Sequence, residues 1–199
     1  MTLLALYDYG AGNIFSLKNS FERLGARVDV VTSFERPYAY DGLLLPGVGN
    51  FDPAMRGMPE YGVREFAGDS MPVLGICLGM EMFLDSSEEG VRRGLGVIPG
   101  KVEALPSDLK VPHMGWNRIT INGNGTLLDG LPDGSWMYFV HSYTARPEDP
   151  ATITAISDYG IEIAAVIEHR NYAGTQFHPE KSGSQGRAIL ENFLGACRR

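Results

Sequence analysis

Short apolar runs that end in glycine-rich turns dominate the first half of the chain. Leu3–Asp8 is the first such run, and it indicates a buried strand that ends at the turn Tyr9–Asn13. Apolar residues at helical spacing follow from Ile14 to Leu24, and Gly25 can stop that helix before a second strand over Ala26–Val31. The pattern predicts a strand–helix–strand unit.

Two more apolar runs repeat this arrangement. Gly42–Leu45 ends at Pro46–Gly49, and Pro72–Ile76 leads into the helical pattern of Cys77–Leu84. Because the alternating strands and helices have short connections, they predict a parallel sheet that helices cover on both faces.

The second half has a different pattern of residues. Short strand-like runs alternate with turn residues, and one helix over 183–197 closes the chain. We therefore predict one α/β domain over residues 1–199. It is a three-layer sandwich whose central sheet is mostly parallel and flanked by helices, with antiparallel strands in its C-terminal half. The strand-like runs are Asn117–Ile121, Trp136–Val140, Thr152–Ile156 and Ile161–Val166.

Composition narrows the class of protein. The 199 residues carry 17 basic and 24 acidic side chains, a net charge of −7, and no basic cluster, which argues against a nucleic acid or an anionic membrane as partner. The sequence shows neither a signal peptide nor an apolar run of membrane-span length. Two cysteines form no disulfide framework and fit a reducing compartment, so we expect a soluble cytoplasmic protein.

A thiol lies between two glycines where a strand is expected to meet a helix, in Gly75–Gly79. Small neighbours at such a tight turn let a nucleophile stand clear of the backbone, and the helix N-terminus favours the thiolate. A lone cysteine is more often a small buried hydrophobe, but the flanking glycines favour a nucleophile at Cys77. Cys197 has no such setting, and we expect only a structural role for it.

A cysteine nucleophile needs a base, and His178 is the best placed of four histidines. It closes an apolar run, and Pro179 fixes the turn that follows. Glu180 could hydrogen-bond the imidazole, although a solvated turn carboxylate is an equal alternative on spacing alone. Cys77, His178 and Glu180 thus form a candidate nucleophile, base and orienting group. The other histidines are His113, His141 and His169, the last in a charged, solvated stretch.

Glycine-rich turns suggest two further functions. Pro46–Gly49, at the end of a predicted parallel strand, could turn backbone N–H groups toward an oxyanion, with the Leu78 amide as second donor. A plain proline–glycine turn is the alternative. Tyr9–Asn13 could cradle a phosphate, but it lacks both the dinucleotide fingerprint and a P-loop lysine.

Taken together, three motifs make the chain resemble the class I, triad-type glutamine amidotransferases. They are the nucleophile motif Gly75–Met80, the His-x-Glu motif Phe177–Glu180 and the oxyanion strand Pro46–Gly49. The resemblance implies that Cys77 attacks the side-chain amide of L-glutamine and forms a thioester, releasing ammonia and then glutamate, without a cofactor or metal. It implies oxyanion contacts from Leu78 and from Gly47, Val48 and Gly49.

Further motifs are similar to the glutaminase subunits of imidazole glycerol phosphate synthases. In that family the segment matching His141, Ser142 and Tyr143 holds the α-amino and α-carboxylate ends of glutamine. The motifs are Asp8–Asn13, Pro112–Asn117, His141–Tyr143 and Gln176–Ser182.

One substrate-binding position departs from the class. Four residues after the cysteine the class usually has glutamine, and here it is Glu81. A carboxylate can accept from the substrate carboxamide but cannot donate as glutamine does, and its charge would raise the thiol pKa. We expect activity to survive this change.

The resemblance also implies a partner, because ammonia made here must be consumed elsewhere. That partner is the (β/α)8 cyclase subunit, with which the chain would form a heterodimer. It receives ammonia through a tunnel and makes imidazole glycerol phosphate and aminoimidazole carboxamide ribotide in histidine biosynthesis. Asn13, Trp116 and Lys181 match interface positions; the alternatives are a helix-start polar residue, a core tryptophan and a surface lysine. Glutaminase activity is expected to be low until the partner and its ligand rearrange the strand around Val48.

Three other functions remain open at this level. A glutaminase of the pyridoxal phosphate or aminodeoxychorismate systems is disfavoured by Pro112–Asn117. A cysteine hydrolase would need neither a partner nor glutamine. A silent regulatory subunit is at odds with an intact set of Cys77, His178 and Glu180.

Overall fold

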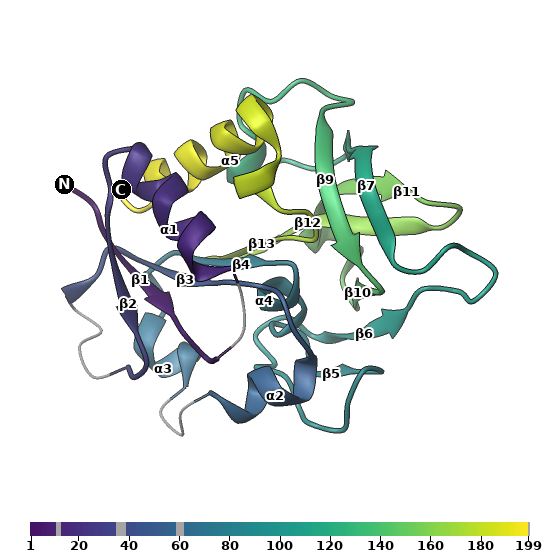
Figure 1. Cartoon of the computed structure of the whole chain (residues 1–199), viewed down its shortest axis with the longest axis horizontal. Helices are drawn as coiled ribbons and strands as arrows, with labels where there is room; N and C mark the ends of the chain where they lie inside the picture. Colours follow the sequence, from purple (N-terminus) through teal and green to yellow (C-terminus); the bar gives the residue numbers. More distant parts are fainter. Residues whose placement is uncertain (11–12, 35–38, 59–61, 199) are drawn as a thin grey trace.

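A large mixed sheet forms the centre of the molecule (Figure 1). The computed structural model describes residues 1–10, 13–34, 39–58 and 62–198. Neighbouring strands of this sheet follow the order β2-β1-β3-β4-β13-β12-β11-β8; the first five run parallel and the last three antiparallel. The predicted α/β class with a mostly parallel sheet is confirmed. The strands are β1 (Leu3–Tyr7), β2 (Arg27–Val31), β3 (Gly42–Leu45), β4 (Val73–Ile76), β8 (Thr120–Ile121), β11 (Ile153–Asp158), β12 (Glu162–His169) and β13 (Tyr172–Thr175).

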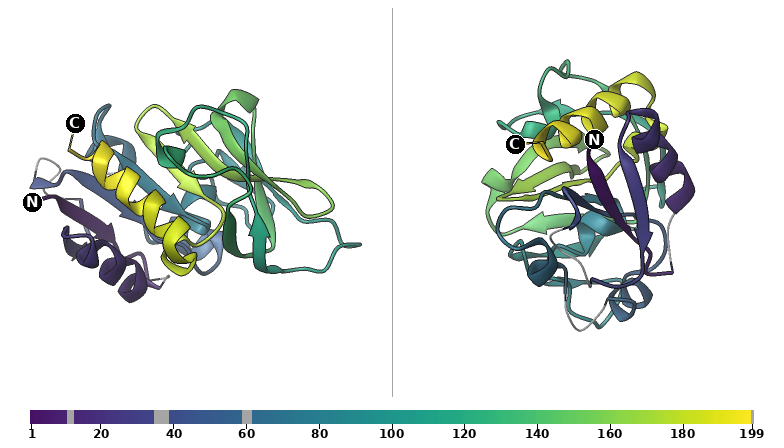
Figure 2. Two further views of the ribbon diagram at one scale, coloured as in Figure 1. Left: turned by 90° about the horizontal axis from the view of Figure 1, so that it is seen from above. Right: turned by 90° about the vertical axis from the view of Figure 1, so that its left-hand side faces the viewer.

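Helices cover both faces of this sheet, as Figure 2 shows in its right-hand view. Alternate residues of β1 face opposite ways: Leu4 and Leu6 pack with one group of helices, and Ala5 and Tyr7 pack with the other. This two-sided burial explains why the parallel strands read as unbroken apolar runs. The helices α1 (Ile14–Arg23) and α5 (Gly183–Ala196) cover one face, and α2 (Phe51–Arg56), α3 (Val63–Ala67) and α4 (Leu78–Glu81) cover the other. Within the described ranges, no helix is long and apolar enough to span a membrane.

Two smaller sheets lie beside the central one. The first contains β10 (Tyr143–Pro147), β6 (Gly100–Ala104) and β5 (Ser86–Ser87). The second is the antiparallel pair of β7 (His113–Arg118) and β9 (Trp136–His141). Short 3-10 helices complete the described elements: η2 (Thr126–Leu128), η3 (Pro150–Thr152) and η4 (Pro179–Lys181).

The predicted strand over 117–121 is wrong in its extent. The chain is in strand β7 up to Arg118, and Thr120 begins β8 in the central sheet. Between them Ile119 is fully buried in the core of the α1 and α5 face, and its N–H donates to the Ser135 carbonyl at 3.0 Å. Burial of this one side chain marks the point where the chain crosses from one sheet to the other.

The sheet order brings three of the sequence motifs to one edge. Strands β3, β4 and β13 are parallel neighbours, so their carboxyl ends lie side by side. Pro46–Gly49 follows β3, Cys77 follows β4 and Gln176–His178 follows β13. Ligands of open α/β sheets bind at this edge, which makes it the candidate site.

Candidate active site

Cys77 sits on a strained turn between β4 and α4. Its φ of 50° and ψ of −107° are unusual for a residue with a side chain, and such a conformation costs on the order of 1–3 kcal/mol. The flanking glycines are required by close approach: a Cβ at Gly75 would lie 2.5 Å from the Gly79 carbonyl oxygen, and one at Gly79 would lie 2.1 Å from that of Leu45. The turn therefore has the form of a nucleophile elbow.

The sulfur of Cys77 is held in a buried, mostly neutral environment. It lies 3.6 Å from the Val140 carbonyl oxygen and 3.8 Å from Nε2 of Gln176. Burial raises the pKa of the Cys77 thiol, and the nearby Glu81 carboxyl raises it further, while the Leu78 amide and Gln176 act in the opposite direction. The thiol is thus protonated at neutral pH, and a base would have to remove its proton before it could act as a nucleophile.

His178 and Glu180 form a buried pair at the neighbouring strand end. Nδ1 of His178 lies 2.9 Å from Oε1 of Glu180, and both side chains are almost completely buried. Because the carboxylate can only accept, Nδ1 carries the proton and Nε2 is left as the basic atom. That Nε2 has no hydrogen-bond partner among the described residues. Glu180 is therefore no solvated turn carboxylate.

The Pro46–Gly49 segment packs directly against the elbow. A Cβ at Gly47 would lie 1.6 Å from the Ile76 carbonyl oxygen and 2.6 Å from the Leu78 nitrogen, so only glycine fits. Gly49 has a φ of 123°, a conformation that favours glycine. Val48 between them is 40% exposed. These backbone groups therefore lie beside the Leu78 amide.

The rival phosphate loop can be followed only in part. Ala11 and Gly12 lie outside the described residues. In the part that is described, the N–H of Gly10 donates to the side chain of Asp8 at 2.8 Å, so it closes a local turn.

A cavity of about 300 Å³ opens beside Cys77. It brings together all eight of the predicted substrate-binding residues: Gly47, Val48, Gly49, Leu78, Glu81, His141, Ser142 and Tyr143. It also has lining residues that the sequence did not single out, namely Asn50, Glu89 and Val140, and it includes Pro112 from the motif Pro112–Asn117.

Glu81 and Gln176 form a buried carboxyl–amide pair at the cavity wall. Nε2 of Gln176 donates to Oε1 of Glu81 at 2.9 Å, and Glu81 is 4% exposed. Burial raises the pKa of Glu81 to about 7; the Gln176 hydrogen bond lowers it in part and the Glu89 charge adds to it. Gln176 belongs to a motif quoted above, but only the pairing of β13 with β4 reveals its contact with Glu81.

The imidazole of His141 is already engaged within the protein. Its Nδ1 lies 2.7 Å from the Tyr143 carbonyl oxygen, and its Nε2 lies 2.9 Å from Nδ1 of His113. Since both ring nitrogens have protein partners, the ring shapes the cavity rather than offering it a free hydrogen-bonding group.

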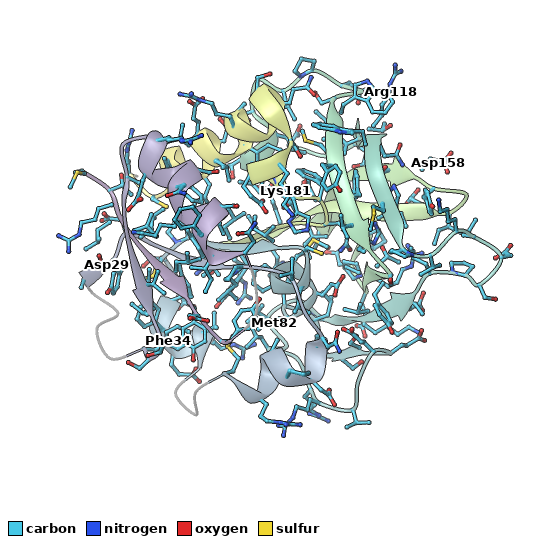
Figure 3. The ribbon with its side chains drawn as sticks, in the orientation of Figure 1. Asp29, Phe34, Met82, Arg118, Asp158 and Lys181 are labelled. Carbon is cyan, nitrogen blue, oxygen red and sulfur yellow. The ribbon has the colours of Figure 1, made fainter. Side chains whose placement is uncertain are left out.

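The three residues expected at an interface are all exposed and lie on neighbouring elements. Asn13 precedes α1 and its side chain accepts from the Ser16 N–H at 3.2 Å, so it caps that helix. Trp116 is 54% exposed and is not a core residue. Lys181, labelled in Figure 3, lies in η4. This short helix packs against both α1 and β9.

Comparisons with known proteins identify the family of the chain. Residues 5–197 match the family model described as glutamine amidotransferase class-I. The chain is 42% identical over 198 residues to "Imidazole glycerol phosphate synthase subunit HisH" of Moorella thermoacetica, covering 97% of this chain and 94% of the relative. It is also 42% identical over 200 residues to the HisH subunit of Archaeoglobus fulgidus, covering 99% and 100% of the two chains.

Solved structures support the fold. A putative GMP synthase subunit from Thermoplasma acidophilum matches with a TM-score of 0.77 and 22% identity, covering 100% of this chain and 94% of the other. PurLQS from Thermotoga maritima matches with a TM-score of 0.78 and 16% identity, covering 98% and 99%. Because the family model and the HisH relatives each span nearly the whole chain, the protein belongs to the class I glutamine amidotransferases and, within them, to the HisH family.

Proposed function

We propose that this protein is the glutaminase subunit of an imidazole glycerol phosphate synthase. It hydrolyses L-glutamine to glutamate and ammonia and delivers the ammonia to a cyclase in histidine biosynthesis. The observation that carries the chemistry is the placement of Cys77 and the His178–Glu180 pair on the ends of adjacent parallel strands. The full-length similarity to HisH subunits supports the pathway.

The reaction divides into two halves at Cys77. Nε2 of His178 takes the thiol proton as sulfur attacks the carboxamide carbon, and then gives that proton to the departing ammonia. A γ-glutamyl thioester remains on the sulfur. His178 next takes a proton from water, whose oxygen attacks the thioester, and returns it to the sulfur as glutamate leaves. Glu180 keeps the imidazole in the tautomer that this requires.

Each tetrahedral intermediate needs donors for its oxyanion. The Leu78 amide supplies one and the backbone of Gly47, Val48 or Gly49 supplies the second. Removing one such donor typically costs about 100-fold or more in kcat. The exposed Val48 can move without disturbing the core, which supports a change in this strand when the partner binds.

Charge in the cavity indicates how glutamine is oriented. Ser142 and Tyr143 line the cavity and would hold its α-carboxylate and α-amino ends. The half-buried Glu89 carboxyl lines the same cavity and accepts from the Phe51 N–H at 2.8 Å. A fixed carboxylate suits the α-ammonium group, so we assign Glu89 to that end.

A single face would receive the cyclase, a (β/α)8 barrel, in a heterodimer. Asn13, Trp116 and Lys181 lie there, on elements that contact one another. Apolar side chains on the same elements are exposed in the isolated chain, and a group of exposed apolar side chains is typical of an interaction surface. They are Phe15 at 74%, Met114 at 62% and Trp136 at 46%. With two free thiols, the protein fits the cytoplasm.

The test is glutamate release with and without the cyclase and its ribotide ligand, for the wild type and for Cys77→Ala. We expect strong stimulation by the pair and complete loss in the variant. Full activity of the isolated chain would contradict the need for a partner. Activity that persists in Cys77→Ala would contradict the nucleophile, and stimulation by another synthase would support the rival glutaminases.

A further inference from the structure

We infer that His113 and Asn117 are positioning residues for glutamine, acting through a directed chain of hydrogen bonds that ends on the backbone of the cavity wall. The chain runs from Asn117 to His113, then to His141 and to the carbonyl of Tyr143. This inference rests on the proposed glutaminase function, because its effect is on glutamine binding.

The direction of the chain is fixed from its cavity end. The Tyr143 carbonyl oxygen can only accept, so Nδ1 of His141, 2.7 Å away, carries the proton. In a neutral imidazole the other nitrogen must then accept, so Nδ1 of His113 donates to Nε2 of His141 across 2.9 Å. It follows that Nε2 of His113 is itself an acceptor.

The direction is fixed independently from the other end. Oδ1 of Asn117 accepts from the Arg118 N–H at 2.8 Å, and Nδ2 donates to the Asp158 carbonyl at 2.8 Å. These two contacts define which way the amide points, so Nδ2 is also the atom that faces Nε2 of His113 at 3.3 Å. Both ends therefore require the same proton positions.

Burial keeps both rings neutral and in place. His113 is 3% exposed and stacks between Phe139 and Tyr159, with ring centroids 4.8 and 3.9 Å away. His141 is 5% exposed, and burial lowers the pKa of each imidazole to about 4. A neutral imidazole has one donor and one acceptor, which is what a directed chain needs.

The end of this chain controls where the substrate-binding turn lies. Ser142 joins β9 to β10, and its carbonyl accepts from the Leu105 N–H at 2.9 Å. The His141 bond to Tyr143 secures the other side of the same turn, which lines the cavity. A turn that holds the ends of glutamine acts equally on substrate and transition state, so its displacement raises KM more than it lowers kcat.

Asn117→Asp reverses the chain, and Asn117→Ala is its matched control. The new carboxylate would draw the His113 proton to Nε2, which leaves two ring acceptors facing each other at His113 and His141. We expect Asn117→Asp to raise KM for glutamine at least about 10-fold with kcat within about three-fold. Asn117→Ala removes the same amide N–H donors but adds no carboxylate that would reverse the proton positions, so the KM of this variant for glutamine should rise less.

A second pair of variants tests the middle of the chain. In His113→Asn the amide can still donate to His141, whereas His113→Phe keeps a stacked ring but has no donor. We expect His113→Asn to stay within a few-fold of the wild-type KM and His113→Phe to behave like Asn117→Asp. Equal KM values in all four variants, or an equal defect in both His113 variants, would overturn the inference.

Two further readouts keep the outcome clear. Ring-nitrogen NMR of the wild type should find the proton on Nδ1 of both His113 and His141, and a proton on Nε2 of either one would refute the chain even if a variant fails to fold. The proposed function fails separately, if the wild type with its cyclase does not hydrolyse glutamine.

Discussion

Replacing Glu81 with glutamine removes a buried charge from beside Cys77 with little change in shape. The wild-type carboxyl is 4% exposed, and Gln176 donates to it at 2.9 Å. A glutamine at this position can still accept that hydrogen bond through its amide oxygen. The substitution therefore isolates the effect of ionisation from that of packing.

The structure sets the size of the effect on stability. Burial raises the pKa of Glu81 from 4.5 to about 7. A raised carboxyl pKa stabilises the fold fully below the unfolded value of 4.5, and that stabilisation is lost as the pH rises through 7. At about 1.4 kcal/mol per pKa unit, the loss amounts to about 3 kcal/mol above neutral pH. Glu81→Gln should remove this dependence.

The nucleophile should respond in the same experiment. The ionised Glu81 carboxyl is the second cause, after burial, of the raised Cys77 pKa. Glu81→Gln should therefore shift the midpoint of iodoacetamide alkylation of Cys77 to lower pH. We expect glutaminase activity to survive, and a large loss would instead show that the rest of the site is adapted to Glu81.

The assay compares urea unfolding of the wild type and Glu81→Gln from about pH 4 to about pH 9, with Glu89→Gln as the control. The free energy of unfolding of Glu81→Gln minus that of the wild type should grow by about 3 kcal/mol over this range. Glu89 is only partly buried, so its variant should show a smaller change. A difference that stays constant with pH would falsify the view that Glu81 titrates in the folded protein.

Three further predictions concern stability and are tested by the same unfolding measurements. Gly79→Ala puts a Cβ 2.1 Å from a backbone oxygen and should lower the free energy of unfolding by at least about 3 kcal/mol. Gly195→Ala lies in open space on α5 and should raise it by about 0.5–1 kcal/mol. Equal effects of the two substitutions would contradict the tight packing around Cys77. Asn13→Ala should cost about 1 kcal/mol by uncapping α1, and Asn13→Ser should restore most of it; no loss in the alanine variant would contradict the cap. Burial lowers the pKa of His113 and His141 from 6.5 to about 4. The neutral rings therefore contribute fully to the free energy of unfolding above pH 6.5, and this contribution is lost as the pH falls through 4, by about 1.4 kcal/mol per pKa unit. His113→Phe should lose less stability than the wild type over that pH range, and an unchanged dependence of stability on pH would argue against neutral rings.

The sequence predicted the fold well where burial leaves a clear trace. Strands β1, β3 and β4 are covered on both faces, so their residues form unbroken apolar runs that can be recognised without a structure. The break at Ile119 was missed because an apolar residue in a strand-like run gives no sign that the chain changes sheets there.

The site residues likewise fall into those that leave a signal in the local sequence and those that do not. Cys77 could be identified because the turn around it excludes side chains and so requires glycines in sequence. Glu89 could not, because a carboxylate in a loop carries no local signal. Gln176 belongs to a motif that the sequence offers, but its contact with Glu81 depends on the pairing of β13 with β4 and could not be predicted. The contact between His113 and His141 depends on strand register, in which these two residues are direct cross-strand partners.

The position of β13 has a consequence for how the protein becomes active during its synthesis. Strand β13 lies between β4 and β12, so the middle of the central sheet is completed by nearly its last segment. Contacts between residues about a hundred positions apart, such as Gln176 with Glu81, form late because closing long loops is entropically costly. A growing chain therefore carries Cys77 long before its proposed base, His178, and the site can be assembled only after the sheet is closed.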